Sequence, residues 1–284
     1  MRVCETVEEL RAARAELRGR VALIPTMGAL HAGHLAHFGA ARKACDAVAV
    51  SVFVNPTQFG PGEDYRRYPR PTEVDLAKCE TAGADLVFVP GDAAVYPPGV
   101  PPVTLDVPTL TDTLEGAHRP AHFAGVCRVV LKLINLFRPD AVTFGQKDYQ
   151  QLCVVRAMVE DLMLGVEVIE VPTMREDGQL AMSSRNAYLD DAARRDALGL
   201  SKALRQALRL VGDGETDPEA VEAMMRSTMT AHRVAVDYAA VRRRRTLSEV
   251  DTIVPGEAVA LVAGRVGGGE RTIRLIDNAP LNGG

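Results

Sequence analysis

The sequence predicts an α/β protein with a parallel sheet, followed by a smaller α+β domain, and three observations lead to this prediction. Apolar runs alternate with charged segments of helical spacing as far as Val171. The runs are apolar along their whole length, as in 46–54 (DAVAVSVFV), which is typical of strands covered on both faces of a parallel sheet. The alternation stops after Val171, where two helical segments rich in Ala, Arg and Met precede three short strands.

Each element follows from the local pattern of apolar residues. Helical spacing predicts helices and uniform apolar runs predict strands. In the first part we expect helices at 5–18, 32–45, 72–82, 123–137 and 147–161, and strands at 21–25, 46–54, 84–89, 140–144 and 166–171. In the second part we expect helices at 190–210 and 217–232, and strands at 234–241, 258–263 and 271–276. The pattern changes near Pro172 to Met174, so we expect two domains, 1–173 and 174–284.

Composition excludes several classes of protein. The 284 residues carry a net charge of −4, which argues against a strongly basic nucleic-acid binder. The longest apolar runs fall far short of the roughly 20 residues that span a membrane. The N-terminus is acidic where a signal peptide would be apolar. The five cysteines form no CxxC pair, so we expect neither a zinc site nor a disulfide framework, and a reduced cytoplasmic protein is the default.

The first chemical motif is PTMGALHAGH, 25–34, which follows a predicted strand and opens a predicted helix. Parallel sheets bind ligands at the carboxyl ends of their strands, and a helix N-terminus favours phosphate. His31 and His34 are three residues apart, so they share a helix face and can donate hydrogen bonds to phosphate oxygens. A metal site is disfavoured because no third ligand stands at a suitable spacing.

Two further motifs also lie where strands end. In FVNPTQF, 53–59, Asn55 suits a turn, whereas Gln58 is open to either a turn or a ligand role. In FGQKDYQQ, 144–151, Lys147 lies at a helix start, where a positive charge is unfavourable unless an anion binds. Asp148 suits a ribose, and Gln151 lies one helical turn beyond Lys147. Alternatively, the polar residues of this motif only lie in the first turn of the helix, exposed to solvent.

The motif AMSSRN, 181–186, lies just beyond the predicted domain boundary. Its two hydroxyls and one guanidinium can clamp an oxyanion, although Ser183 or Ser184 could equally cap a helix. A place between two domains favours a mobile lid. Walker A, GxGxxG and nucleophile-elbow patterns do not occur, which disfavours P-loop enzymes, classical dehydrogenases and serine hydrolases. The four motifs together predict a nucleoside triphosphate site beside a small polar substrate.

These motifs carry a family resemblance. Together with DYRRYPR, MVEDL, PTMRE and MSSRNAYL, in this order and spacing, they resemble the pantothenate synthetase (pantoate–β-alanine ligase) family. The resemblance extends to RLIDNAPL, 274–281. The His-x-x-His element alone is similar to the wider nucleotidyltransferase and class I aminoacyl-tRNA synthetase superfamily. The ordered set is specific to the ligases.

The resemblance implies a fold, a reaction and a set of site residues. It implies a Rossmann-like domain at 1–173 that binds nucleotide and pantoate, a lid domain at 174–284, and a homodimer through the first domain. It implies ATP and Mg²⁺, with pantoate, β-alanine and a pantoyl-adenylate intermediate. His34, His31, Lys147 and Arg185 are implied as catalytic, with His34 as proton donor. ATP contacts are implied for Met27, Gly28, Ala29, Leu30, His31, Ala32, Gly33, His34, Gly145, Gln146, Lys147, Asp148, Met174, Met182, Ser183, Ser184 and Arg185.

For the substrates the resemblance implies that Gln58 and Gln151 hold pantoate, with Gln58 also near β-alanine. Asp75 is a candidate Mg²⁺ helper, although Val74 stands beside it where the family often has an acid. Arg119 and His122 are expected at the substrate end or, equally, as surface residues. The base that deprotonates β-alanine is not identified by the sequence. Two rival functions stay open: a transferase that stops at nucleotide transfer, and a non-catalytic nucleotide sensor.

Overall fold

The computed structural model describes residues 1–269 and 272–282, and the chain divides into two compact units. One unit comprises 1–145 and 150–172, and the other comprises 146–149 and 173–284. The short segment 146–149 lies N-terminal to the expected boundary but packs with the second unit. In the described part of the chain, no helix is both long enough and apolar enough to cross a membrane.

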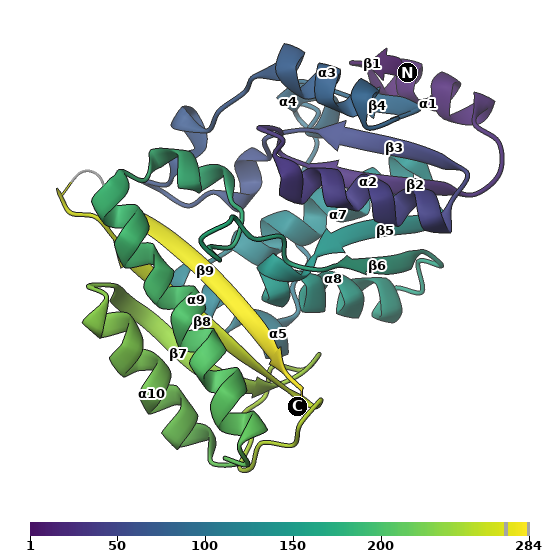
Figure 1. The fold of residues 1–284 in the computed structure, drawn as a ribbon. Helices are drawn as coiled ribbons and strands as arrows, with labels where there is room; N and C mark the ends of the chain where they lie inside the picture. Colours follow the sequence, from purple (N-terminus) through teal and green to yellow (C-terminus); the bar gives the residue numbers. More distant parts are fainter. Residues whose placement is uncertain (270–271, 283–284) are drawn as a thin grey trace. The chain divides into compact units, whose positions relative to one another are not determined.

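The first unit is built on a six-stranded parallel sheet with the order β1-β4-β3-β2-β5-β6 (Figure 1). The strands are β1 (Arg2–Cys4), β2 (Val21–Thr26), β3 (Ala47–Val52), β4 (Leu86–Phe88), β5 (Ala141–Gly145) and β6 (Glu167–Val171). The chain runs outward from β2 to β3 and β4, then returns to β5 on the other side of β2. Strand order therefore reverses at β2 and β5, the place where such sheets bind ligands at their carboxyl edge.

Helices cover both faces of this sheet. They are α1 (Val7–Glu16), α2 (Ala32–Ala44), α3 (Thr72–Thr81), α7 (His122–Phe137) and α8 (Tyr149–Asp161), with short turns α4 (Asp92–Val95), α5 (Pro108–Thr111), α6 (Glu115–His118), η1 (Pro56–Gln58) and η2 (Asp64–Arg67). Figure 1 shows α2 in front of the sheet and α7 behind it. Phe38 of α2 and Cys79 of α3 share a core with alternate residues of β2 and β3. On α7, Phe137 packs edge-on against Phe88, with ring centroids 6.0 Å apart.

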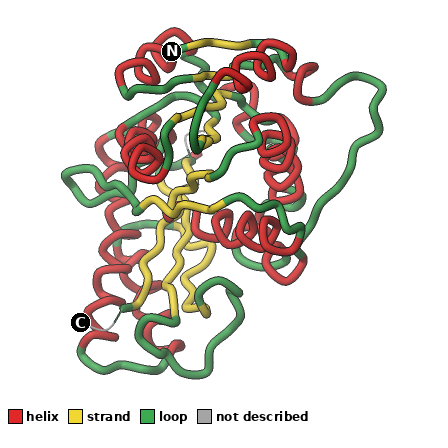
Figure 2. Tube along the Cα trace, turned by 90° about the vertical axis from the view of Figure 1, so that its right-hand side faces the viewer, coloured by secondary structure: helices red, strands yellow, loops and turns green. Residues whose placement is uncertain are grey.

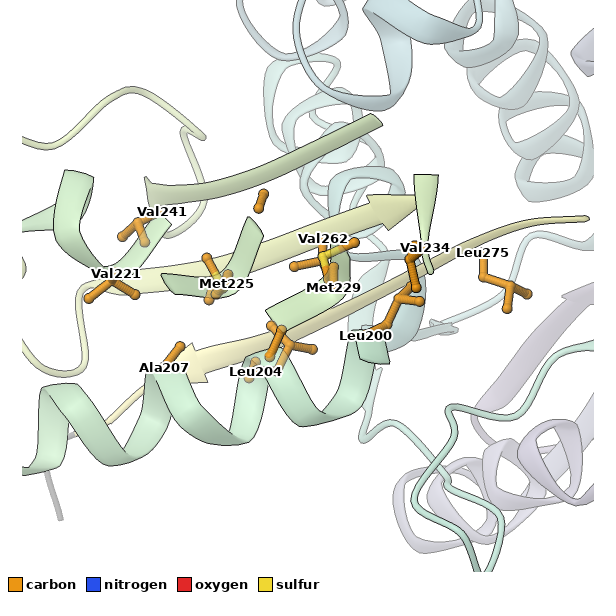
Figure 3. Packing of buried hydrophobic residues seen from close by; sticks show 14 of the residues in the cluster. Leu200, Leu204, Ala207, Val221, Met225, Met229, Val234, Val241, Val262 and Leu275 are labelled. Atoms are coloured by element: carbon orange, nitrogen blue, oxygen red, sulfur yellow. The ribbon is translucent and has the colours of Figure 1, made fainter. Parts of the chain in front are cut away.

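The second unit is an antiparallel sheet of order β7-β8-β9 with two long helices on it (Figure 2). Its elements are η3 (Gln146–Asp148), η4 (Ser184–Tyr188), α9 (Asp191–Gly212), α10 (Pro218–Ala231), β7 (Ala235–Arg243), β8 (Ala258–Val266) and β9 (Ile273–Leu281). Leu204 of α9 and Met225 of α10 meet Val262 of β8 in a buried core (Figure 3). The amphipathic spacing of both helices supplies this core, because residues three and four apart share one face.

The predicted fold class is confirmed: an α/β parallel sheet is followed by a smaller α+β part. Strand β1 was not predicted. The expected strand 271–276 begins at residue 271, which lies outside the described residues, and β9 runs from Ile273 to Leu281. All five cysteines lie in the described part, are buried and form no disulfide. Strand β7 ends at Arg243 with two ion pairs, Arg242 with Glu222 at 3.0 Å and Arg243 with Glu257 at 3.2 Å.

Candidate functional site

The turn after β2 is held by a buried carboxylate. Gly28 and Ala29 both have left-handed backbones, with φ of 81° and 51°. The backbone N–H groups of Ala29 and Leu30 donate to the two oxygens of Asp75 at 2.7 and 2.8 Å, and Asp75 is 1% exposed. A Cβ on Gly28 would lie 2.8 Å from an Asp75 oxygen, so glycine is required by both space and φ. Asp75 on α3 thus fixes the path of the chain into α2.

The two histidines of this motif form the N-terminal cap of α2. His31 is the N-cap residue, and its Nδ1 accepts from the backbone N–H of Gly33 at 3.1 Å. The Nδ1 of His34 accepts from the backbone N–H of His31 at 3.2 Å, and the two ring centroids are 4.2 Å apart. A neutral ring that accepts at Nδ1 carries its proton on Nε2. Both rings therefore present an Nε2–H donor at a helix N-terminus, which suits an anion.

A third imidazole on α2 was missed by the sequence reasoning. His37 lies three residues after His34, and its Nδ1 lies 2.8 Å from the hydroxyl of Thr143 on β5. A Cβ on Gly145 would lie 3.4 Å from the Nε2 of His37. The signal that could have found it is its spacing of three residues from His34, which makes the two side chains neighbours on the helix.

Gln58 belongs to a buried polar network at the end of β3. Its Oε1 accepts from the Nδ2 of Asn55 at 3.0 Å, and that same Nδ2 donates to the carbonyl of Gly125 at 3.1 Å. The Oδ1 of Asn55 accepts from the hydroxyls of Tyr96 at 2.7 Å and Thr57 at 2.9 Å. Asn55 also caps η1, which agrees with its predicted turn role. The network fixes the orientation of the Gln58 amide, with its oxygen toward Asn55.

Arg119 and His122 lie against the backbone of Gln58. Arg119 makes a two-pronged ion pair with Glu63, at 2.8 and 2.7 Å, and donates to the Nε2 of His122 at 3.1 Å. The Nδ1 of His122 then donates to the carbonyl of Gln58 at 2.8 Å. Burial and the charge of Arg119 lower the pKa of His122 to about 4, so its ring is neutral. Burial would raise the pKa of Glu63, but Arg119 holds it below its usual value.

The two glutamines of α8 differ in their surroundings. Gln150 is 3% exposed, and its amide nitrogen donates to the carbonyls of Leu110 and Thr113 while its oxygen accepts from the N–H of Glu115. Gln150 therefore anchors the loop before α7. Gln151, the predicted pantoate residue, is half-buried.

In the second unit, the predicted residues Gln146, Lys147 and Asp148 form η3. The side-chain amide of Asn278 on β9 donates to the carbonyls of Gln146 at 2.8 Å and Lys147 at 2.9 Å. The Nζ of Lys147 lies 3.4 Å from a carboxylate oxygen of Asp148, and the Lys147 side chain is 20% exposed. The Asn278 side chain thus holds this segment through its backbone carbonyls.

The predicted residues Met174 and 182–185 lie on one hairpin-like segment of the second unit. The N–H of Met182 donates to the carbonyl of Met174 at 2.9 Å, so these two residues are brought together. Ser183 caps η4 by accepting from the N–H of Arg185 at 3.3 Å, which confirms the helix-cap alternative for this serine. Asn186 follows, buried, with its amide bonded to Glu176 and to the carbonyl of Ala181.

A protein-built metal cage is not part of this arrangement. Among residues 1–269 and 272–282, no group of three or more His, Cys, Asp or Glu side chains is placed to hold a metal ion. Both oxygens of Asp75 accept backbone N–H groups.

Comparison with known proteins finds a family model and relatives that match nearly the whole chain. The family model described as pantoate-beta-alanine ligase matches residues 2–280. The pantothenate synthetase of Chloroflexus aurantiacus is 49% identical over 284 residues, covering 100% of this chain and 99% of that protein. The pantothenate synthetase of Myxococcus xanthus is 45% identical over 285 residues, covering 99% and 96%.

Solved structures give the same result. The pantothenate synthetase of Thermus thermophilus superposes with a TM-score of 0.92 at 45% identity, covering 99% of this chain and 100% of that one. The pantoate-beta-alanine ligase of Francisella tularensis, complexed with beta-gamma ATP and beta-alanine, gives 0.80 at 29% identity, covering 100% and 99%. The family model, the relatives and the solved structures thus agree that the chain belongs to the pantoate–β-alanine ligase family.

Proposed function

We propose that this ligase condenses (R)-pantoate with β-alanine at the expense of ATP, through pantoyl adenylate. In the first half-reaction a carboxylate oxygen of pantoate attacks the α-phosphorus of ATP, and pyrophosphate leaves. In the second, the amine of β-alanine attacks the pantoyl carbonyl, and AMP leaves with formation of the amide. The observation that carries this proposal is the histidine cap of α2, because it places two imidazoles, each accepting a backbone N–H at Nδ1, at a helix N-terminus, where an anion is favoured.

The ATP contacts proposed here are the residues that the family resemblance implies. In the first unit they are the turn and helix start 27–34 and Gly145. In the second they are 146–148, Met174 and 182–185. Negative charge accumulates on the phosphates as pyrophosphate leaves, and oriented donors stabilise it. In this assignment His34 donates a proton or hydrogen bond, with His31 beside it, while Lys147 and Arg185 neutralise phosphate charge.

The proposed pantoate residues are Gln58 and Gln151. The oxygen of the Gln58 amide accepts from Asn55, so its nitrogen is the group available to donate to a carboxylate or hydroxyl oxygen. The neutral His122 and the paired Arg119 support the Gln58 backbone without adding net charge beside it. This rigid support favours a fixed position for the bound acid.

We also propose Mg²⁺, a homodimer and a cytoplasmic setting. Mg²⁺ would be held mainly by ATP phosphates and water, because both oxygens of Asp75, the helper that the resemblance suggests, already accept backbone N–H groups. The dimer is proposed to form through the first unit, as the family resemblance implies, and light scattering on the purified protein tests it. Five buried cysteines that form no disulfide suit a reducing compartment.

The deciding experiment measures AMP and pyrophosphate release from ATP, Mg²⁺, pantoate and β-alanine, with one component omitted at a time. We expect AMP in the complete mixture, and ATP–pyrophosphate exchange with pantoate alone. Nucleotide transfer without dependence on the amine would indicate a transferase with another acceptor. ATP binding with neither exchange nor AMP would indicate a sensor and would contradict the ligase proposal.

A further inference from the structure

Two adjacent side chains of β9 hold the two segments of the second unit that carry proposed phosphate-binding residues. Asp277 and Asn278 are 4% and 3% exposed. Successive side chains of a strand point to opposite faces, so the two cannot serve one partner. Asp277 binds Arg175, at the start of the segment that leads to 182–185, whereas Asn278 binds the backbone of η3.

The amide of Asn278 is committed to η3. Its Nδ2 donates to the carbonyls of Gln146 at 2.8 Å and Lys147 at 2.9 Å, which uses both of its hydrogens. The reverse orientation of the amide would set its oxygen against those two carbonyl oxygens, so the assignment is fixed by chemistry. The Oδ1 is buried and has no hydrogen-bond partner in the described structure. A buried acceptor left unmatched is a cost to folding, so stability alone does not account for Asn278.

The carboxylate of Asp277 is committed to the other segment. Its two oxygens accept from the two terminal nitrogens of Arg175, at 2.7 and 3.0 Å. Arg175 also donates to the carbonyl of Gln179, across a turn that is closed by an isolated antiparallel bridge between Arg175 and Ala181. A bidentate pair of this kind fixes direction as well as distance. The turn then continues directly into Met182 and the proposed phosphate residues.

The two anchors are coupled to each other. The backbone N–H of Asn278 donates to the Oδ1 of Asp277 at 2.8 Å, so the carboxylate that holds Arg175 also caps the residue that holds η3. The strand beneath them is rigid, because β9 pairs with β8 over its full length, with Asp277 opposite Val262 and Asn278 opposite Leu261.

We propose that Asp277 and Asn278 are positioning residues that set the backbone of Lys147 and the segment 182–185 at a fixed separation for the phosphates of ATP. The inference rests on the proposed function, which assigns Lys147, Ser183, Ser184 and Arg185 to those phosphates. Neither anchor touches the nucleotide in this scheme. Each acts through the backbone segment that it holds, as supporting residues of preorganised sites do.

The test compares Asn278→Ala and Asp277→Asn with the control Asn282→Ala, which changes an exposed residue just beyond the same strand. ATP affinity is measured directly by calorimetry, and the KM for ATP is measured by pantoate-dependent ATP–pyrophosphate exchange. We expect both anchor variants to weaken ATP binding and raise this KM about tenfold or more, at a folded fraction confirmed by thermal unfolding. The control should match the wild type.

A second readout separates positioning from general damage. When pantoyl adenylate is supplied directly, its reaction with β-alanine involves no pyrophosphate group, so the anchor variants should lose much less in this step than in exchange. Arg175→Lys keeps the cation but not the two-pronged pair, and it should give an intermediate KM for ATP. The Arg175 side chain is 25% exposed, so Arg175→Lys is expected to fold. It therefore tests the inference if Asn278→Ala does not fold.

The outcomes distinguish the inference from the proposed function. Folded anchor variants with wild-type ATP affinity and KM would overturn the inference alone. Equal losses in exchange and in the β-alanine step would also overturn it, because they indicate general damage. A wild type that binds ATP but shows no exchange would overturn the proposed function. The ATP affinities of the variants, measured by calorimetry, would still test the positioning roles of Asp277 and Asn278. A wild type that does not bind ATP would overturn both.

Discussion

Gly125 lies so close to the backbone of Thr57 that a Cβ atom at position 125 would stand 2.2 Å from the Thr57 carbonyl oxygen. The contact joins α7 to η1, and the carbonyl of Gly125 also accepts from the side chain of Asn55, which orients Gln58. A methyl group at this position cannot be accommodated without moving η1, because its nearest neighbours are backbone atoms of Thr57 and Gln58.

We therefore predict that Gly125→Ala destabilises the protein by about 1–3 kcal/mol, the usual cost of overpacking. We also expect a KM for pantoate raised several-fold, because Gln58 would move with η1. Gly39→Ala is the matched control, since it lies within α2 and a Cβ there meets nothing within 4 Å. That change should stabilise by up to about 1 kcal/mol through helix propensity. Denaturant unfolding and pantoate titration check both variants. An unchanged KM for pantoate in Gly125→Ala would show that the position of η1 does not affect pantoate binding.

Asp75 gives the second prediction, which also tests its candidate Mg²⁺ role. In Asp75→Asn an NH₂ group replaces one oxygen and faces a backbone N–H, so one buried hydrogen bond is lost and two donors meet. We expect a loss of about 2–3 kcal/mol in unfolding free energy, typical of an unmatched buried group that had a charged acceptor. The KM for ATP should rise because the turn at 28–30 loosens, while the Mg²⁺ concentration for half-maximal activity should stay unchanged.

The control for this variant is Glu73→Gln, which removes an exposed carboxylate from the same first turn of α3 and should behave as the wild type. A large increase in the Mg²⁺ requirement of Asp75→Asn, without a loss of stability, would contradict the turn-holding role and favour metal binding.

The sequence predicted helices and strands correctly where a single local pattern determines the element. Uniform apolar runs marked β2 and β3, because both faces of these strands are covered. It missed β1, which has three residues with two exposed and no periodic pattern. In β9 the buried pair Asp277 and Asn278 interrupts the alternation that would mark a strand, and this strand extends five residues past its predicted end at 276.

For the site as well, residues in local motifs could be predicted from the sequence, whereas residues that act through distant contacts could not. His31, His34 and Gln58 could be selected from motifs at strand ends. The supporting residues Tyr96 and Asn278 could not, because their roles depend on contacts distant in sequence. Tyr96 reaches Asn55 across 41 positions, and Asn278 reaches Lys147 across 131. Nothing in the local sequence of either residue indicates its partner.

The histidine cap gives the third prediction, which distinguishes the role of Nδ1 in His34 from that of its Nε2–H group. In His34→Asn the amide oxygen can replace Nδ1 as acceptor of the His31 N–H, but nothing replaces the Nε2–H donor. In His34→Gln an amide nitrogen can reach the Nε2 position, but the cap is lost. We expect His34→Asn to keep its stability within about 1 kcal/mol and to lose about 10²–10⁴-fold in exchange rate.

His34→Gln should show the opposite balance, with lower stability and partial recovery of the exchange rate. Thermal unfolding and pantoate-dependent ATP–pyrophosphate exchange measure the two effects separately. Wild-type exchange by His34→Asn would contradict the assignment of the Nε2–H group as the donor to phosphate.

The buried, neutral His122 gives a pH prediction. Its pKa is lowered to about 4 in the folded protein, first by burial and then by the charge of Arg119, whereas an unfolded histidine titrates near 6.5. Between these two values the unfolded chain binds the proton and the folded chain does not, so stability increases with pH across this window. The contribution is complete above about pH 6.5 and is lost as pH falls toward 4, amounting to about 3 kcal/mol at most.

His122→Asn removes this titration while keeping a donor for the carbonyl of Gln58. We expect its unfolding free energy to depend less steeply on pH than that of the wild type, by up to about 1.4 kcal/mol per pH unit between pH 4 and 6.5, the effect of one proton. Urea unfolding at several pH values measures the slopes. His118→Asn, which changes an exposed histidine on α6, should keep the wild-type slope. Equal slopes for the wild type and His122→Asn would show that His122 takes up its proton without unfolding, and the neutral ring bridging Arg119 and Gln58 would then be the wrong protonation state.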